Sequence, residues 1–353
     1  MKRQINKFSA LKNFNQVLLF LALLFAMLYY GRVFLIPIAT SALLAMLLVP
    51  VCRKLESWRW KRGWAAFGTV VCMLLIVLGV LSVLVNELIG LGQDIHVIAD
   101  RLRKMVDQAH GFVSDRFHVS RGQQQEYLQG QVSAWANIAG RWLGGAVFSV
   151  VGTLGNLLVV TVYTILMLIY RTRIKTFILE LVNRYAGITE VAQAEVIVEK
   201  ITRVASLYVG GIFLVVLILS VVYFVGLTVI GVENALFFAI LAALINVIPY
   251  IGSVAGGAIV VLYTFITGDS LMVPVIVALF FAGVQQLDSY LLTPKITGGK
   301  VRLGPLFTIM VLLLGGMLWG IAGMILFIPI LGICKVAFDH IEPLKPYGYL
   351  VGD

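Results

Sequence analysis

The chain has 353 residues, of which 60% are hydrophobic and only 12% are charged, and its mean hydropathy is +0.99. Soluble domains are about one quarter charged, so this composition argues against a cytosolic globular enzyme. The apolar residues form long runs without Asp, Glu, Lys or Arg, and most of them reach the ~20 residues that a membrane-crossing helix needs. These runs are 13–31, 33–52, 63–86, 142–170, 204–232, 234–268, 270–287 and 303–334. We predict an all-α polytopic membrane protein with about eight transmembrane segments.

The net charge of +10 is distributed at the ends of these runs. With the N-terminus inside, twenty of the 27 basic residues fall on the inner side, against nine of the 17 acids. This asymmetry follows the positive-inside rule. Membrane topology therefore accounts for the positive charge, and no nucleic-acid partner is needed to explain it. We therefore expect cytoplasmic N- and C-termini, a lipid environment, and an uncleaved first span.

The first 203 residues divide into three expected regions. Residues 1–88 are expected to form three transmembrane helices. In 89–141, apolar residues recur every three or four positions, which predicts an extracytoplasmic helical insert whose apolar stripes need cover from each other or from a neighbouring subunit. Residues 142–203 are expected to hold a fourth transmembrane helix and cytoplasmic amphipathic helices. Three cysteines without a C-x-x-C pair support neither a disulfide framework nor a zinc ribbon, and we expect no metal or cofactor.

The C-terminal third, with an expected transport core at 204–338 and a cytoplasmic tail at 339–353, is different. The runs 234–268 and 303–334 are too long for one span and short for two. The motif N-V-I-P-Y-I-G-S at 246–253 interrupts the first run, and a glycine-rich stretch at 315–323 interrupts the second. Proline and glycine at these places predict broken helices. Each run is either a pair of short crossings or a re-entrant hairpin, and the short arms favour the hairpin.

Two hairpins would make the core an inverted repeat. Residues 204–267 would form a span followed by a hairpin entering from outside. Residues 270–338 would form a span followed by a hairpin entering from inside. Paired interrupted segments of opposite orientation are typical of secondary transporters. The alternative is that glycine and proline only allow close packing of helices.

Three segments carry a resemblance to a known family. They are A-L-I-N-V-I-P-Y-I-G-S, L-L-T-P-K-I-T-G-G-K-V-R-L-G-P-L and G-G-M-L-W-G-I-A-G-M-I-L-F-I-P-I, all within 243–332. The chain resembles the autoinducer-2 exporter family of bacterial membrane transporters, over nearly its whole length. The resemblance implies an inner-membrane transporter that assembles as a homo-oligomer. It also implies export of small polar signals such as autoinducer-2, or, as in some members, sodium/proton antiport.

The resemblance also implies which residues line the pathway. In the first break they are Asn246, Pro249, Gly252 and Ser253, and the neighbouring Tyr250 is a further candidate for the pathway. In the following loop they are Pro294, Lys295 and Gly298, and in the second break Gly316, Gly320 and Gly323. Some members have Glu where this chain has Thr293, so a mechanism with two carboxylates is in doubt here.

One acid stands out by its position. Asp288 ends the seventh span beside Gln285, and an acid at that depth costs several kcal/mol unless it is paired or faces water. It is therefore a candidate for exchanging protons or binding a cation, the alternative being an interfacial partner for Lys295. Asn246 and Ser253 could bind a polar solute or only cap the broken helices.

The sequence favours a transporter over an enzyme, because it lacks H-E-x-x-H, G-x-S-x-G and P-loop motifs. We predict a secondary transporter that exports a small polar solute by alternating access around two broken hairpins that meet near mid-membrane, with H⁺ or Na⁺ as possible coupling ions. A sodium/proton antiporter and an oligomeric channel remain as alternatives.

Overall fold

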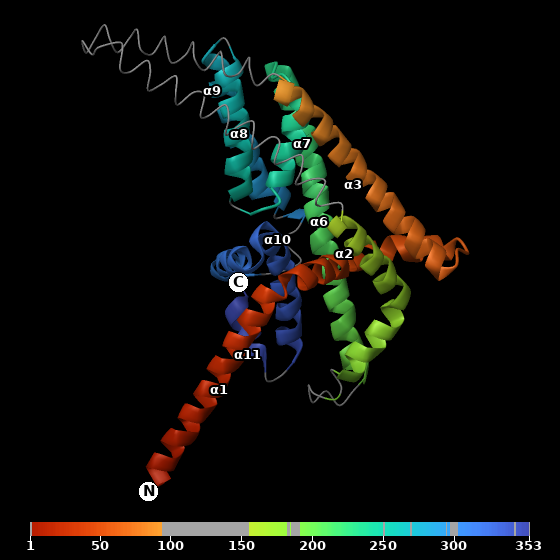
Figure 1. The fold of residues 1–353 in the computed structure, drawn as a ribbon, viewed down its shortest axis with the longest axis vertical. Coiled ribbons are helices and arrows are strands. Elements are labelled where there is room, and N and C mark those ends of the chain that lie inside the picture. The colour runs from red at the N-terminus through yellow and green to blue at the C-terminus, as the bar shows by residue number, and fades with distance from the viewer. Residues whose placement is uncertain are drawn as a thin grey trace, which may run out of the picture. The chain divides into compact units, whose positions relative to one another are not determined.

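The computed structural model describes most of the chain, and all of its regular elements are helices (Figure 1). The described residues are 2–93, 155–181, 184, 191–249, 251–268, 270–293, 295–296, 303–341 and 344–352. The labelled elements are α1 (Lys2–Tyr30), α2 (Arg32–Ser57), α3 (Arg62–Gln93), α6 (Val191–Ile230), α7 (Ala235–Ile245), α8 (Ile251–Thr267), α9 (Met272–Leu287), the π-helix η1 (Asp288–Leu292), α10 (Pro305–His340) and α11 (Lys345–Val351). A further helix covers Gly155–Leu181. No strand occurs in these ranges, and the prediction of an all-α fold is confirmed.

Six helices of the described residues are long and apolar enough to cross a membrane. By length and composition they lie at Arg32–Ser57, Arg62–Gly90, Gly155–Leu181, Glu195–Ile230, Met272–Leu292 and Pro305–His340, the last of which is bent at Gly320. Three shorter apolar helices, at Asn15–Tyr30, Ala235–Ile245 and Ile251–Thr267, account for the remaining predicted segments. The chain is therefore a polytopic membrane protein, as predicted. Most of the expected extracytoplasmic insert, from residue 94 onward, lies outside the described residues.

The chain divides into two compact units, each built from separate stretches of sequence. The terminal unit contains Met1–Val70, Val159–Gly210 and Thr297–Asp353, and the central unit contains Val71–Leu158 and Gly211–Ile296. The first predicted hairpin belongs to the central unit and the second to the terminal unit.

In the central unit, α7 and α8 form a tight antiparallel hairpin. Gly252 lies against the Ile245 carbonyl, and a Cβ on Gly256 would lie 3.1 Å from the Ala242 Cα. The two helices run antiparallel, because the later residue on α8 meets the earlier residue on α7. With eleven and 17 residues, the arms are about 16 and 25 Å long, short of a ~30 Å hydrocarbon core.

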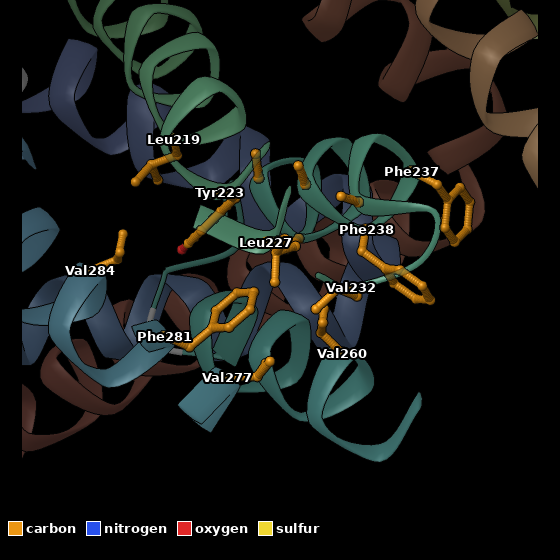
Figure 2. Close-up of a cluster of buried hydrophobic side chains, with 14 of the residues drawn as sticks. Leu219, Tyr223, Leu227, Val232, Phe237, Phe238, Val260, Val277, Phe281 and Val284 are labelled. Atoms are coloured by element: carbon orange, nitrogen blue, oxygen red, sulfur yellow. The ribbon is translucent and has the colours of Figure 1, made fainter. Parts of the chain in front are cut away.

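Aromatic and branched side chains fill the core of the central unit (Figure 2). Tyr223 of α6 is 1% exposed and stacks on Phe281 of α9, with ring centroids 4.7 Å apart. Gly226, one turn further along α6, lies directly against the Phe280 ring, so a side chain at that position would displace it. This packing fixes α9 against the second half of α6.

In the terminal unit, α10 folds back on itself at Gly320. This glycine has φ 62° and ψ −142°, a conformation that is far from helical and that other residues rarely adopt. Gly315 and Gly323 lie in backbone contact, although residues eight apart in a straight helix are about 12 Å apart. The ends of α10 also converge on α11, because the Gly304 N–H donates to Val351 O at 3.0 Å and Gly348 lies against Asp339.

The bend of α10 packs against the N-terminal helices. The Trp319 indole N–H donates to the Leu28 carbonyl of α1 at 2.9 Å. Trp319 and Leu318 pack with Leu43 of α2 in one apolar cluster. Only Gly31 separates α1 from α2, and the two helices meet there at an angle (Figure 1). Both predicted hairpins are thus present, while their depth and opposite orientation in a membrane stay predictions.

Candidate functional site

Asp288 is a buried acid at the end of α9, with a side chain that is 6% exposed. Both carboxylate oxygens accept a hydrogen bond. The Asn246 amide donates to Oδ2 at 3.1 Å, and the Thr293 hydroxyl donates to Oδ1 at 2.8 Å. The acid is therefore held by two neutral donors that come from different elements of the central unit.

The π-helical turn explains how Thr293 reaches the acid. In an α-helix, residues five apart point roughly 140° away from each other. In a π-helix the bonds run from i to i+5, and the Thr293 N–H donates to the Asp288 carbonyl. The Thr293 side chain therefore lies above Asp288, on the same side of the helix. Such π-turns within α-helices occur frequently at functional sites.

Asn246 reaches the acid because α7 ends there. Pro249 has no N–H to donate to the Ile245 carbonyl, which instead accepts a bond from Ile248 at 3.0 Å. The chain then turns and α8 begins at Ile251. Gly252 is needed at this turn, because a Cβ would collide with the Ile245 carbonyl and lie 2.7 Å from the Asn246 Cα. The sequence of the break therefore fixes the position of the Asn246 side chain.

Two further polar groups belong to this part of the central unit. The Gln285 amide donates to Ser289 at 3.2 Å, but its carbonyl oxygen is buried without a partner among the described residues. Gln285 precedes Asp288 by three positions, so both lie on one face of the helix. Tyr223 of α6 lies in the same buried cluster as Val284, which is one helical turn before Asp288.

The remaining predicted residues of the first break and the loop are distributed differently. Ser253 is half-buried on the first turn of α8. Lys295 is exposed, and within the described part of the chain it forms no ion pair with Asp288. Asp288 bonds instead to Asn246 and Thr293, which disfavours the alternative of an interfacial pair. Three predicted site residues, Tyr250, Pro294 and Gly298, lie outside the described residues.

The predicted glycines of the second break all lie around the bend of α10. Gly323 lies against the Gly315 carbonyl, Gly316 against the Met324 side chain, and Gly320 forms the bend. These contacts are between backbone and apolar groups. The glycines belong to the terminal unit, whereas Asn246 and Asp288 belong to the central unit.

Sequence reasoning did not select Thr293, Tyr223 or Gly315 as site residues. Thr293 was recognised only as a residue that cannot ionise, although its position five residues after Asp288 becomes informative once a π-turn is known. Tyr223 had no signal, because a tyrosine within an apolar run usually belongs to the core. Gly315 begins the glycine-rich stretch and could have been included.

The site offers oxygen atoms of several kinds around one carboxylate. Hard cations prefer oxygen ligands, and the unpartnered Gln285 carbonyl and the Asp288 carboxylate are such ligands. Among the described residues, no group of three or more His, Cys, Asp or Glu gathers for a metal ion. A single carboxylate with neutral neighbours suits a proton or a monovalent cation better than a divalent metal.

Comparison with known proteins identifies the family. The model of the family described as AI-2E family transporter matches residues 18–342. This chain belongs to the AI-2E transporter family. The resemblance found in the sequence is thereby confirmed, and membrane transport is the activity of the family.

Individual relatives agree with this assignment. A candidate transport protein of Mycobacterium tuberculosis, MT0215, is 26% identical over 84% of this chain and 80% of its own length. YueF of Bacillus subtilis, also named as a candidate transport protein, is 34% identical over 39% of this chain and 37% of its own. A third such protein, from Borreliella burgdorferi, is 30% identical over 41% of this chain and 40% of its own. The match thus spans about two fifths of the length of the last two relatives.

Proposed function

We propose that this AI-2E family transporter is an ion-coupled secondary transporter that exports a small polar solute, similar to autoinducer-2, across the bacterial inner membrane. The observation that supports the proposal is the buried Asp288, held by Asn246 at the break of the first hairpin and by Thr293 on the π-turn. An ionisable group buried in a membrane segment is costly and is usually functional.

The hydrogen bond from Asn246 supplies a physical route from ion binding to movement. A proton or cation on the Asp288 carboxylate would compete with the two donors that now bond to it. Losing the Asn246 bond would loosen the tip of the α7–α8 hairpin from α9, because this bond joins the break to the acid. A ligand shifts a conformational equilibrium only by binding one state better than the other. Here a proton or cation would bind better to the state in which Asn246 has released the Asp288 carboxylate. We propose alternating access around the two hairpins on this basis.

Sodium/proton antiport is the second candidate, and the Gln285 carbonyl favours it. A buried carbonyl oxygen without a donor is unfavourable, and a bound cation would satisfy it. In that case the same site would carry Na⁺ and H⁺ in turn, and no organic solute would be needed. An oligomeric channel is the third possibility.

Flux measurements in proteoliposomes separate these functions. The purified protein would be reconstituted, and a panel of small polar solutes would be followed under imposed proton or sodium gradients. Saturable solute flux that follows the gradient would support the exporter, and Na⁺-driven proton movement without solute would support the antiporter. Steady single-channel current in a planar bilayer would contradict both. Asp339→Asn, which changes an acid paired with Lys335 in the terminal unit, is the matched control for Asp288→Asn.

The remaining expectations belong to the same proposal. We propose cytoplasmic N- and C-termini and a homo-oligomer. We also propose five regions along the chain: N-terminal helices (1–88), insert (89–141), fourth helix with amphipathic segments (142–203), transport core (204–338) and tail (339–353). The charge distribution supports the orientation. In the structure, the amphipathic stretch after residue 171 continues the Gly155–Leu181 helix, and α6 begins at Val191.

A further inference from the structure

A pocket with both apolar and charged lining residues lies in the terminal unit, between α2, the Gly155–Leu181 helix and the first half of α6. Its volume is about 660 Å³, within the range of about 300–1,000 Å³ that is typical of small-molecule sites. Asp288 and the other residues of the central unit do not contribute to it. The pocket is therefore a second site, separate from the one described above.

One part of the pocket is apolar, and the other carries four basic residues and one acid, Glu199. Met46, Val49 and Leu207 are among the apolar lining residues. The basic residues are Arg53, Arg171, Lys175 and Arg203. Such a lining fits a ligand that has both an apolar part and an anionic part.

Two of the four basic side chains are neutralised within the protein. Arg171 pairs with Glu56, and Lys175 lies 3.2 Å from Glu195 and 3.5 Å from Glu199. Arg53 and Arg203 have no ion pair with any described residue, although both line the pocket. The hydroxyl groups of Thr172 and Ser206 also lack hydrogen-bond partners in the described part of the chain. With four basic residues against three acids, the pocket and its ion pairs have a net charge of +1. Arg53 and Arg203 are the cations outside these pairs, and the two hydroxyl groups are free to donate.

Neighbouring aromatic residues indicate the depth of the pocket in a membrane. Trp58 and Trp60, shortly after Arg53, are 64% and 46% exposed, and Tyr170, next to Arg171, is 47% exposed. Exposed tryptophan and tyrosine at the ends of membrane helices mark the level of the lipid head groups. Arg53 and Arg171 thus lie near the level of lipid phosphates.

We propose that this pocket binds the phosphate of an anionic phospholipid, with Arg53 and Arg203 as its main ligands. Guanidinium groups form strong paired hydrogen bonds to phosphate oxygens, and Thr172 and Ser206 can donate to the remaining ones. Leu207 lines the pocket and is 38% exposed, so it can offer the acyl chain an apolar contact. A free phosphate would have no use for this apolar part. Basic pockets between membrane helices are known to suit anionic head groups.

Lipid binding to the purified full chain tests the proposal. In a neutral detergent, native mass spectrometry and thermal shift would compare phosphatidylglycerol with phosphatidylcholine of the same acyl chains. We expect one saturable phosphatidylglycerol site per chain. The double substitution Arg53→Gln and Arg203→Gln should weaken that binding by about a hundredfold, because each of the two charged hydrogen bonds contributes about tenfold. Phosphatidylcholine binding should not change.

The control is a double substitution that removes the same charge outside the pocket, Lys54→Gln and Arg173→Gln. It should change the affinity for phosphatidylglycerol less than about threefold, because exposed charges act only through screened electrostatics. Ser206→Trp fills the pocket without changing charge and should also abolish the saturable site. Equal loss in the control pair, or equally tight phosphatidylcholine binding, would overturn the proposal. Displacement of phosphatidylglycerol by millimolar inorganic phosphate or glycerol 3-phosphate would also overturn it, in favour of a site for free anions.

Discussion

The two hairpins of this transporter reverse the chain by different means. In the first, a five-residue break between α7 and α8 contains a proline and presents Asn246 to a buried acid. In the second, a single glycine with positive φ turns α10 back, and the arms meet through the backbones of Gly315 and Gly323. Both breaks bring two helical arms together, but only the first also places a polar side chain against an ionisable group.

This difference indicates a division of roles. The first hairpin holds a polar network in which a change of charge at Asp288 would be felt by the Asn246 amide. The second hairpin has no ionisable group among the residues around its bend, and its close approach depends on the absence of side chains. Added volume at the close glycines should affect stability in both hairpins, whereas we expect chemical substitutions to affect transport only at the first.

The largest expected effect concerns the faces from which the hairpins can be labelled. In a background without the three native cysteines, cysteine at Glu233 or Ser270 should react with an impermeant thiol reagent added outside whole cells. Cysteine at Leu303 or Ile341 should react only from inside. These outcomes are all-or-none, because each pair of positions flanks a hairpin that returns to its own side.

Labelling of Glu233 and Ser270 from opposite faces would show that the first run crosses the membrane, and the inverted repeat would be lost. The same result for Leu303 and Ile341 would be difficult to reconcile with the bend at Gly320.

Gly323→Ala should destabilise the protein by about 3 kcal/mol, the upper end of the cost of overpacking. The added Cβ would collide with the Gly315 carbonyl, so the arms of α10 must separate. The thermal midpoint of the purified protein measures the effect. Gly283→Ala is the control, because nothing lies within 4 Å of its Cβ position. A normal midpoint for Gly323→Ala would mean that the two arms are not in contact.

Asp288→Asn should remove most ion-coupled flux, at least about tenfold, and cost only about 1 kcal/mol of stability. Asn is nearly isosteric and can still accept from Asn246 while donating to the Thr293 oxygen. Gradient-driven uptake into vesicles, at matched protein levels, measures the loss. Undiminished flux, with the same response to the gradient as wild type, would remove Asp288 from the mechanism.

Thr293→Val should have the smallest effect. It removes one hydrogen bond, which contributes about 1 kcal/mol, and should lower flux about fivefold. It removes the hydroxyl that donates to Asp288 but keeps the shape of the side chain. Thr293→Ser retains the donor and should restore most of the flux. If Ser and Val behave alike, the hydroxyl has no role beyond packing.

Most of the fold could be predicted because the membrane imposes simple rules. The uncharged runs predicted the helices closely: 33–52 lies within α2, and 270–287 nearly coincides with α9. The breaks were predicted because proline and glycine interrupt backbone hydrogen bonds wherever they stand. The centre of the second break, Gly320, lies within the predicted stretch. The short link at Gly31 between α1 and α2 could not be predicted, because two adjacent apolar runs do not reveal the angle between them.

The candidate site was predictable only in part. Asp288 and Asn246 were selected separately, one by its depth and one by its motif, but nothing in the sequence shows that they bond to each other. Their contact depends on how the tip of one hairpin packs on a different helix, which is a tertiary property. The π-turn at Asp288 depends on one extra residue in a helical turn, and single-residue changes of period leave no clear pattern in an apolar run.

The bond from Trp319 to the Leu28 carbonyl ties the bend of the second hairpin to the last turn of α1. That carbonyl is among the four at a helix end that have no partner within the helix. In lipid such a group cannot turn to water, so leaving it unbonded is expensive. A swing of the hairpin would therefore either pull α1 with it, with Gly31 as the joint, or break the bond at high cost. The N-terminal helix would thus either move with the hairpin or resist its movement. An antibody that immobilises α1 would therefore slow transport, although it binds outside the transport core.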